Sequence, residues 1–143
     1  MSYPNLILQP DDVDMVIYHN NCSDGFGSAF SAWQYLSKKF PKREIEYIGA
    51  THGDKPPDTK GKCVVIADFS YKKPILLELI KESKKIAILD HHLTAMEDLR
   101  EIPDEYKIFD MSHSGAHLAW RFFFPNKKVP LLIQYIEDRD IWK

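Results

Sequence analysis

The sequence predicts a three-layer α/β fold, in which a mainly parallel five-stranded sheet carries helices on both faces. Several segments of strand length are apolar on both faces, as in residues 62–69 (KCVVIADF), and such runs are typical of strands buried on both faces. Segments with helical spacing alternate with these strands, which is the pattern of parallel βαβ units. The 143 residues suffice for a single domain with one core.

Each element has its own local signal. The predicted strands are residues 14–19, 43–50, 62–69, 85–90 and 106–111. The predicted helices are residues 28–40, 73–83, 114–124 and 130–138. Apolar residues recur at helical spacing in the first of these helices, at Ala29, Ala32, Trp33 and Leu36. Pro125 ends the third helix, and glycine, proline and aspartate make residues 51–61 a loop.

The overall composition excludes several classes of protein. A net charge of −2 gives no general attraction to nucleic acid or anionic lipid, so any anion site must be local. The apolar runs are too short to cross a membrane, and the N-terminus lacks a secretory signal. Cys22 and Cys63 do not make a disulfide framework, and we interpret both as small buried apolar residues. A reducing cytoplasm is the expected compartment.

Titratable side chains follow three of the predicted strands. They are His19 at the end of the first strand and Asp24 after it, Asp68 near the end of the third, and Asp90, His91 and His92 at the end of the fourth. The carboxyl ends of parallel strands lie at one edge, and ligands bind there. Taken singly, such an aspartate could cap a helix and such a histidine could be structural. Together they favour one polar site at this edge.

Such a site demands a particular chemistry. Gathered carboxylates repel one another, so either their pKa values rise or a cation neutralises them. A donor set of imidazoles and carboxylates is better suited to a divalent ion such as Mn²⁺ than to a zinc ion of the kind that thiolates bind. Two ions about 3.5–4 Å apart, bridged by one carboxylate, are the usual device for phosphoryl chemistry with an activated water. The sequence has neither the G-x-S-x-G elbow of a serine hydrolase nor a P-loop.

A second feature is the start of the helix predicted over residues 114–124. Ser112 and Ser114 stand there, where free N–H groups make an anion site that could hold a phosphate. The alternative is plain N-capping, which we favour. His52, after the second strand, could lie at the margin of the main site.

Four motifs occur in a familiar order: YHNNCSDGFGSAFSAW, VVIADFS, DHH and YIEDRDIW. This order resembles the DHH phosphoesterase superfamily, named for a signature of the Asp90-His91-His92 type. Its members include RecJ-like exonucleases, oligoribonucleases and exopolyphosphatases, and the resemblance covers nearly the whole chain. It implies a hydrolase: a divalent-metal-dependent phosphoesterase that cleaves a phosphodiester or phosphoanhydride with metal-activated water.

The resemblance also implies a ligand set. His19 and Asp24 would bind a first metal ion, Asp68 would bridge two ions, and His91 and Asp138 would bind the second. The expected ions are Mn²⁺ or Mg²⁺, one or two per chain.

Three residues are implied in catalysis. His92 would contact the phosphate, Asp68 would hold both ions, and Asp90 would orient a ligand imidazole from outside the ligand set. Asp140 is a weaker candidate for the position given to Asp138.

The chain departs from the family pattern in two ways. Many relatives have a second aspartate two positions after the first, and Phe26 stands there, so one ligand is missing. Relatives also carry a C-terminal substrate-binding domain, and residues 1–143 would be the catalytic domain without it. An alternative is therefore a non-catalytic nucleotide- or metal-binding domain. The expected partners are a phosphate-containing small molecule or short oligonucleotide, and a second copy of the chain or the C-terminal domain.

Overall fold

The fold is that of a parallel α/β domain, seen in a computed structural model that describes residues 3–141, with side chains to residue 139. Five strands of this part form one sheet in the order β2-β1-β3-β4-β5, and each neighbouring pair is parallel. The strands are β1 (Met15–His19), β2 (Glu46–Ala50), β3 (Cys63–Ala67), β4 (Lys85–Asp90) and β5 (Lys107–Phe109). The helices are α1 (Ser23–Lys39), α2 (Lys73–Glu82), α3 (Leu93–Asp98), α4 (Gly115–Phe123) and α5 (Leu131–Ile141). The predicted fold class is confirmed.

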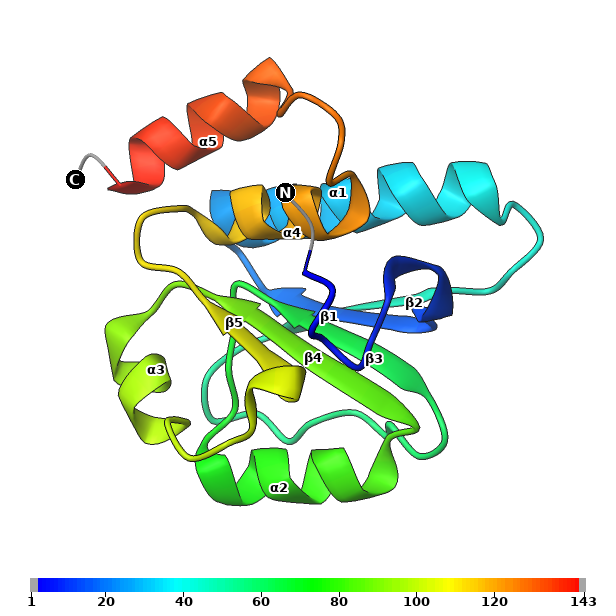
Figure 1. The fold of residues 1–143 in the computed structure, drawn as a ribbon, viewed down its shortest axis with the longest axis vertical. Coiled ribbons are helices and arrows are strands. Elements are labelled where there is room, and N and C mark those ends of the chain that lie inside the picture. The colour runs from blue at the N-terminus through cyan, green and yellow to red at the C-terminus, as the bar shows by residue number, and fades with distance from the viewer. Residues whose placement is uncertain (1–2, 142–143) are drawn as a thin grey trace.

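The sheet separates two apolar cores because successive strand residues point to opposite faces. In β3, Val65 packs into one core, whereas Val64 and Ile66 pack into the other. Helices α1 and α4 cover the first face, α2 and α3 lie on the second, and α5 packs outside α1 and α4 (Figure 1). The two-sided burial explains why these strands are apolar along their whole length.

The strand order creates a crevice beside β1. The chain runs from β1 through α1 to β2 on one side, and β3 pairs with the other side of β1. From β3 the chain passes through α2, on the opposite face, to β4. The order of connection therefore reverses between β1 and β3, and such switch points are where open α/β sheets bind ligands.

Helix α1 begins five residues earlier than the sequence predicts, at Ser23, so Asp24 lies in its first turn. Two glycines, Gly25 and Gly27, lie in this additional part of the helix, where the neighbouring atoms leave no room for a side chain. A Cβ on Gly25 would lie 1.9 Å from the carbonyl oxygen of His19, and one on Gly27 would lie 2.8 Å from Ala116. These glycines therefore permit the start of the helix to pack closely against β1 and α4.

The apolar face of α1 also differs in part from the prediction. Ala32 and Leu36 are fully buried, but Trp33 is 50% exposed, and its ring lies tilted against that of Phe30. No helix within residues 3–141 is both long enough and apolar enough to span a bilayer.

Candidate metal centre

The register of the sheet brings three predicted site residues to one level. Ala67 of β3 pairs with Tyr18 of β1 and with Leu89 of β4. The next residues along these strands therefore stand side by side at the carboxyl edge, and they are His19, Asp68 and Asp90. This is the edge, beside the β1–β3 switch point, that the sequence indicates.

Asp68 has an unusual backbone conformation. Its N–H still donates to the carbonyl oxygen of Leu89 at 2.9 Å, but its φ is 58°, in the left-handed region. Aspartate visits this region more readily than most residues, but at a cost in free energy. Strain of this kind concentrates at functional sites, and here it accompanies a side chain that is 1% exposed.

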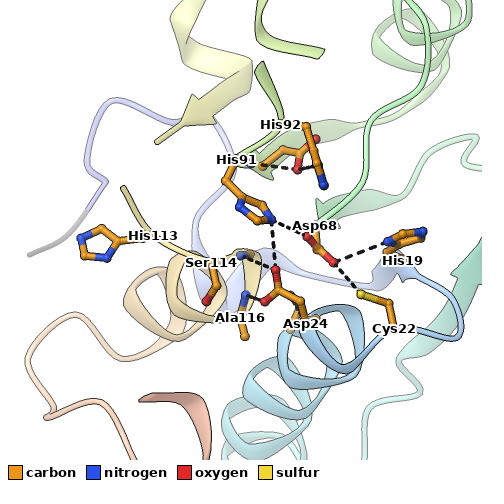
Figure 2. Close-up of polar contacts among 12 residues, drawn as sticks. His19, Cys22, Asp24, Asp68, His91, His92, His113, Ser114 and Ala116 are labelled. Carbon is orange, nitrogen blue, oxygen red and sulfur yellow. Dashed lines mark hydrogen bonds and ion pairs between the residues drawn. The ribbon is translucent and has the colours of Figure 1, made fainter. Parts of the chain in front are cut away.

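The two carboxylate oxygens of Asp68 face different neighbours (Figure 2). Oδ1 lies 2.9 Å from Nε2 of His91. Oδ2 lies 3.7 Å from Nδ1 of His19 and 3.7 Å from Sγ of Cys22. Asp68 therefore stands between an imidazole on one side and an imidazole with a thiol on the other.

Asp24 joins the cluster from α1. Its Oδ2 lies 3.0 Å from Nε2 of His91 and accepts the N–H of Gly115 at 2.9 Å, while Oδ1 accepts the N–H of Ala116 at 2.7 Å. The N-terminus of α4 thus binds this carboxylate, as the positive end of a helix dipole favours. A Cβ on Gly115 would lie 2.5 Å from Cβ of Asp68, so only glycine allows this approach.

Their surroundings shift the pKa values of the two buried carboxylates in opposite directions. Burial, together with the nearby Asp24 carboxylate, raises the pKa of Asp68 to about 7 against the opposing hydrogen bond to His91. Burial also disfavours the charged form of Asp24, but hydrogen bonds from His91 and the Ala116 N–H outweigh it and lower its pKa. Burial opposes protonation of His91, yet its bonds to Asp24 and Asp68 raise its pKa to about 10.

These shifts describe a pair of carboxylates that needs a positive charge between them. In the absence of a cation, the proton on His91 supplies that charge. A divalent cation would supply it instead and release the imidazole as a ligand. The donor set of carboxylate oxygens and imidazole nitrogens therefore fits a divalent metal ion.

Asp90 holds His92. Its Oδ1 lies 2.7 Å from Nδ1 of His92 and accepts the backbone N–H of His91 at 2.8 Å, and its Oδ2 accepts the hydroxyl of Ser70 at 2.7 Å. The imidazole that Asp90 orients is thus that of His92. His92 is half-exposed, and it lines a cleft of about 330 Å³ together with Asp90 and His52.

The start of α4 is occupied by groups of the chain itself. Ser114 is buried and caps the helix by accepting the N–H of His117 at 3.1 Å, which is the N-capping alternative. Its own N–H donates to Glu137 at 2.8 Å. Ser112 is exposed and bonds to Asp110. The N–H groups suggested as a phosphate site are therefore bound by carboxylates of the chain.

The structure does not bring Asp138 into the cluster. Its side chain is exposed beside Leu131 and Tyr135 on α5. Its neighbour Glu137 points inward instead, to Nδ1 of His117 at 3.1 Å and of His113 at 3.3 Å. The side chain of Asp140 lies outside the described residues. A ligand role for either aspartate stays a prediction.

Cys22 is the site residue that sequence reasoning missed. The prediction looked for a second acidic ligand two positions after Asp24, but Phe26 is 59% exposed and stacks on Phe30. The residue that enters the cluster stands two positions before Asp24 and is Cys22. Its ligand atom, with those of His19 and Asp68, forms a set within 4.8 Å of one another. The Cys-x-Asp spacing was the available signal.

An α/β fold with carboxylates and imidazoles at its switch point has a donor set that could hold a divalent cation. Residues 14–137 match the family model described as the DHH family, N-terminal domain, and the chain belongs to this family. Its similarity to the DHH phosphoesterases is thereby confirmed at the level of the family.

Two similar proteins add to this. The chain is 40% identical over 149 aligned residues to "Uncharacterized protein R106" of Acanthamoeba polyphaga mimivirus, covering 96% of this chain and 35% of that protein. A crystal structure of an uncharacterized protein from Helicobacter pylori G27 superposes with a TM-score of 0.66 at 16% identity, over 90% of this chain and 42% of that one. The second likeness shows the fold alone. The chain spans about a third of its mimivirus relative's length.

Proposed function

We propose that this domain is a divalent-metal-dependent phosphoesterase. Its substrate would be a phosphodiester or phosphoanhydride in a nucleotide, a short oligonucleotide or a polyphosphate. The observation that carries the proposal is the placement of Asp68, whose two oxygens face two separate sets of ligand atoms. A carboxylate that serves two neighbouring positions is the feature that two-metal phosphoryl transfer requires.

The ligands proposed are those of the cluster. Asp24, Asp68 and His91 offer oxygen and imidazole donors that suit Mn²⁺ or Mg²⁺, and His19 faces the other oxygen of Asp68. A bound divalent ion would supply Lewis-acid stabilisation of the charge that develops on the phosphoryl oxygens. Burial of both carboxylates keeps their charge unscreened by water and directed at the ion.

His92 is the group proposed to contact the phosphate. The hydrogen bond to Asp90 raises the pKa of His92, so the ring carries a proton more readily. With Nδ1 engaged by Asp90, Nε2 is the atom directed at a phosphate oxygen. Ser70 fixes the other oxygen of Asp90, which limits rotation of this pair.

The test is hydrolysis of bis(p-nitrophenyl) phosphate and of a short RNA oligonucleotide with Mn²⁺, by the wild type and by Asp68→Ala. Removal of Asp68 should reduce turnover by about 10²-fold or more while the circular dichroism spectrum is retained. Asp104→Ala is the matched control because the Asp104 side chain is 97% exposed. Equal turnover by Asp68→Ala would contradict the assignment. Tight Mn²⁺ binding without turnover in the wild type would support the non-catalytic alternative.

A further inference from the structure

We propose that Cys22 is a metal ligand, and that it makes one of the two ion positions a thiolate site. This inference rests on the proposed metal centre. The site would consist of His19 Nδ1, Cys22 Sγ and Asp68 Oδ2, and its ion would be of the Zn²⁺ class, such as zinc, cobalt(II) or ferrous iron. The other position, with Asp24 and His91, would keep the harder Mn²⁺ or Mg²⁺.

The turn between β1 and α1 directs both side chains to one place. His19 is the last residue of β1, and Cys22 is the N-cap of α1, in an extended conformation with φ −141°. Asn21 between them has a φ of 53°, which reverses the chain within three residues. Figure 2 shows the His19 ring and the Cys22 sulfur converging on the same carboxylate of Asp68.

The donor set has the composition of a zinc-type site. The three ligand atoms lie within 4.8 Å of one another, one each from imidazole, thiol and carboxylate. Three protein ligands with an open fourth position are typical of catalytic Zn²⁺ sites. A thiolate favours softer ions, so exchanging a carboxylate for sulfur moves preference away from Mn²⁺ and Mg²⁺.

The two oxygens of Asp68 would face the two proposed ion positions, and the other ligand atoms differ between these positions. Oδ1 of Asp68 lies 2.9 Å from Nε2 of His91, which is also 3.0 Å from Oδ2 of Asp24, whereas Oδ2 of Asp68 faces the thiol of Cys22. The plainer explanation is a weak S–H hydrogen bond from Cys22 to Asp68 at 3.7 Å, with no role for the sulfur. A measurement that detects a sulfur–metal bond separates the two.

Cys63 provides an internal control. It is 5% exposed in β3 and packs with Val13, Val65 and other apolar residues of the first core. It therefore serves as the small buried apolar residue that we expected both cysteines to be, whereas Cys22 is half-buried at the cluster.

The experiment is a Co²⁺ titration of the metal-free chain, followed by absorption spectroscopy. A thiolate bound to cobalt(II) gives an intense near-ultraviolet charge-transfer band. The wild type and Cys63→Ser should show this band, and Cys22→Ser should lack it. Zn²⁺ affinity, measured by competition with a chromophoric chelator, should fall by about 10²-fold or more in Cys22→Ser. Cys22→Asp should recover divalent binding but prefer Mn²⁺.

A second measurement needs no variant. Saturating Zn²⁺ should protect Cys22 of the wild type from alkylation, detected on its own peptide by mass spectrometry. Absence of the charge-transfer band in the wild type, or an unchanged band in Cys22→Ser, would overturn the proposal. If the wild type hydrolyses substrate with Mn²⁺ but shows no charge-transfer band with Co²⁺, the thiolate site is rejected and the phosphoesterase assignment stands. A band without hydrolysis by any metal-loaded form would reject the phosphoesterase assignment and leave this inference standing.

Discussion

Oδ2 of Asp24 accepts the backbone N–H of Gly115 at 2.9 Å, across 91 residues of sequence. Oδ1 of the same carboxylate accepts the N–H of Ala116 at 2.7 Å. Through these bonds Asp24, on α1, binds the N-terminus of α4, while its Oδ2 also lies 3.0 Å from Nε2 of His91 in the candidate metal centre. Asp24 thus contributes both to the fold and to the candidate site.

Replacement of Asp24 by alanine should lower the stability of the metal-free chain. Two buried N–H groups would lose a charged acceptor, which costs about 2–3 kcal/mol in the free energy of unfolding. Urea denaturation followed by circular dichroism measures this directly. Asp24→Asn retains one acceptor oxygen and should lose less. Equal stability of Asp24→Ala and the wild type would show that these bonds contribute nothing net.

Gly115→Ala should disturb Asp68 through steric contact. The added Cβ would lie 2.5 Å from Cβ of Asp68, so either α4 or the Asp68 backbone must move. We expect a loss of about 1–3 kcal/mol in stability, and weaker divalent binding measured by calorimetry. The control is Gly61→Ala, where φ is 71° and nothing lies within 4 Å. It should lose stability through backbone strain but bind metal as the wild type does.

The stability of the metal-free chain should depend on pH through His91. Its pKa of about 10 in the fold is above the ordinary 6.5, so the folded state binds a proton more tightly than the unfolded chain. The resulting stabilisation is complete below pH 6.5 and is lost as pH rises through about 10. The melting temperature should therefore fall across this window.

His91→Gln should flatten this dependence because the titrating ring is gone. Bound Mn²⁺ should also flatten it, since the ion replaces the proton. Melting curves at several pH values, with and without the metal, make the comparison. A wild-type melting temperature that rises between pH 6.5 and 10 would contradict the assigned shift.

Ser70→Ala should separate catalysis from metal binding. Loss of the hydroxyl frees one oxygen of Asp90 and loosens its hold on His92. We expect kcat for phosphodiester hydrolysis to fall by about tenfold with little change in Mn²⁺ affinity. His92→Ala should show a larger fall in kcat of the same kind. A parallel loss of Mn²⁺ affinity in both variants would instead make His92 a ligand.

Local patterns in the sequence were sufficient for the sheet. The apolar run of residues 86–89, flanked by Lys85 and Asp90, predicts β4 with the bounds observed, because burial on both faces leaves no polar positions within the run. The shared edge of His19, Asp68 and Asp90 follows from parallel pairing alone. These features depend on neighbours in sequence and on a general rule of sheet topology.

Contacts between distant segments were not predictable in the same way. The role of Gly25 depends on the carbonyl oxygen of His19, and that of Asp24 depends on α4. On α5 the choice between Glu137 and Asp138 depends on helix rotation, since adjacent residues differ by about 100°. Cys22 went unnoticed because a lone cysteine usually fills a core, as Cys63 does.

The most direct test of the central claim is equilibrium dialysis of the wild type and Asp68→Asn against Mn²⁺ and Co²⁺, with the bound metal analysed. If Asp68 serves both positions, Asp68→Asn should lose the bound Mn²⁺ and the thiolate–cobalt band together while keeping its circular dichroism spectrum. If a folded Asp68→Asn binds both metals as tightly as the wild type does, this carboxylate does not join two cation positions.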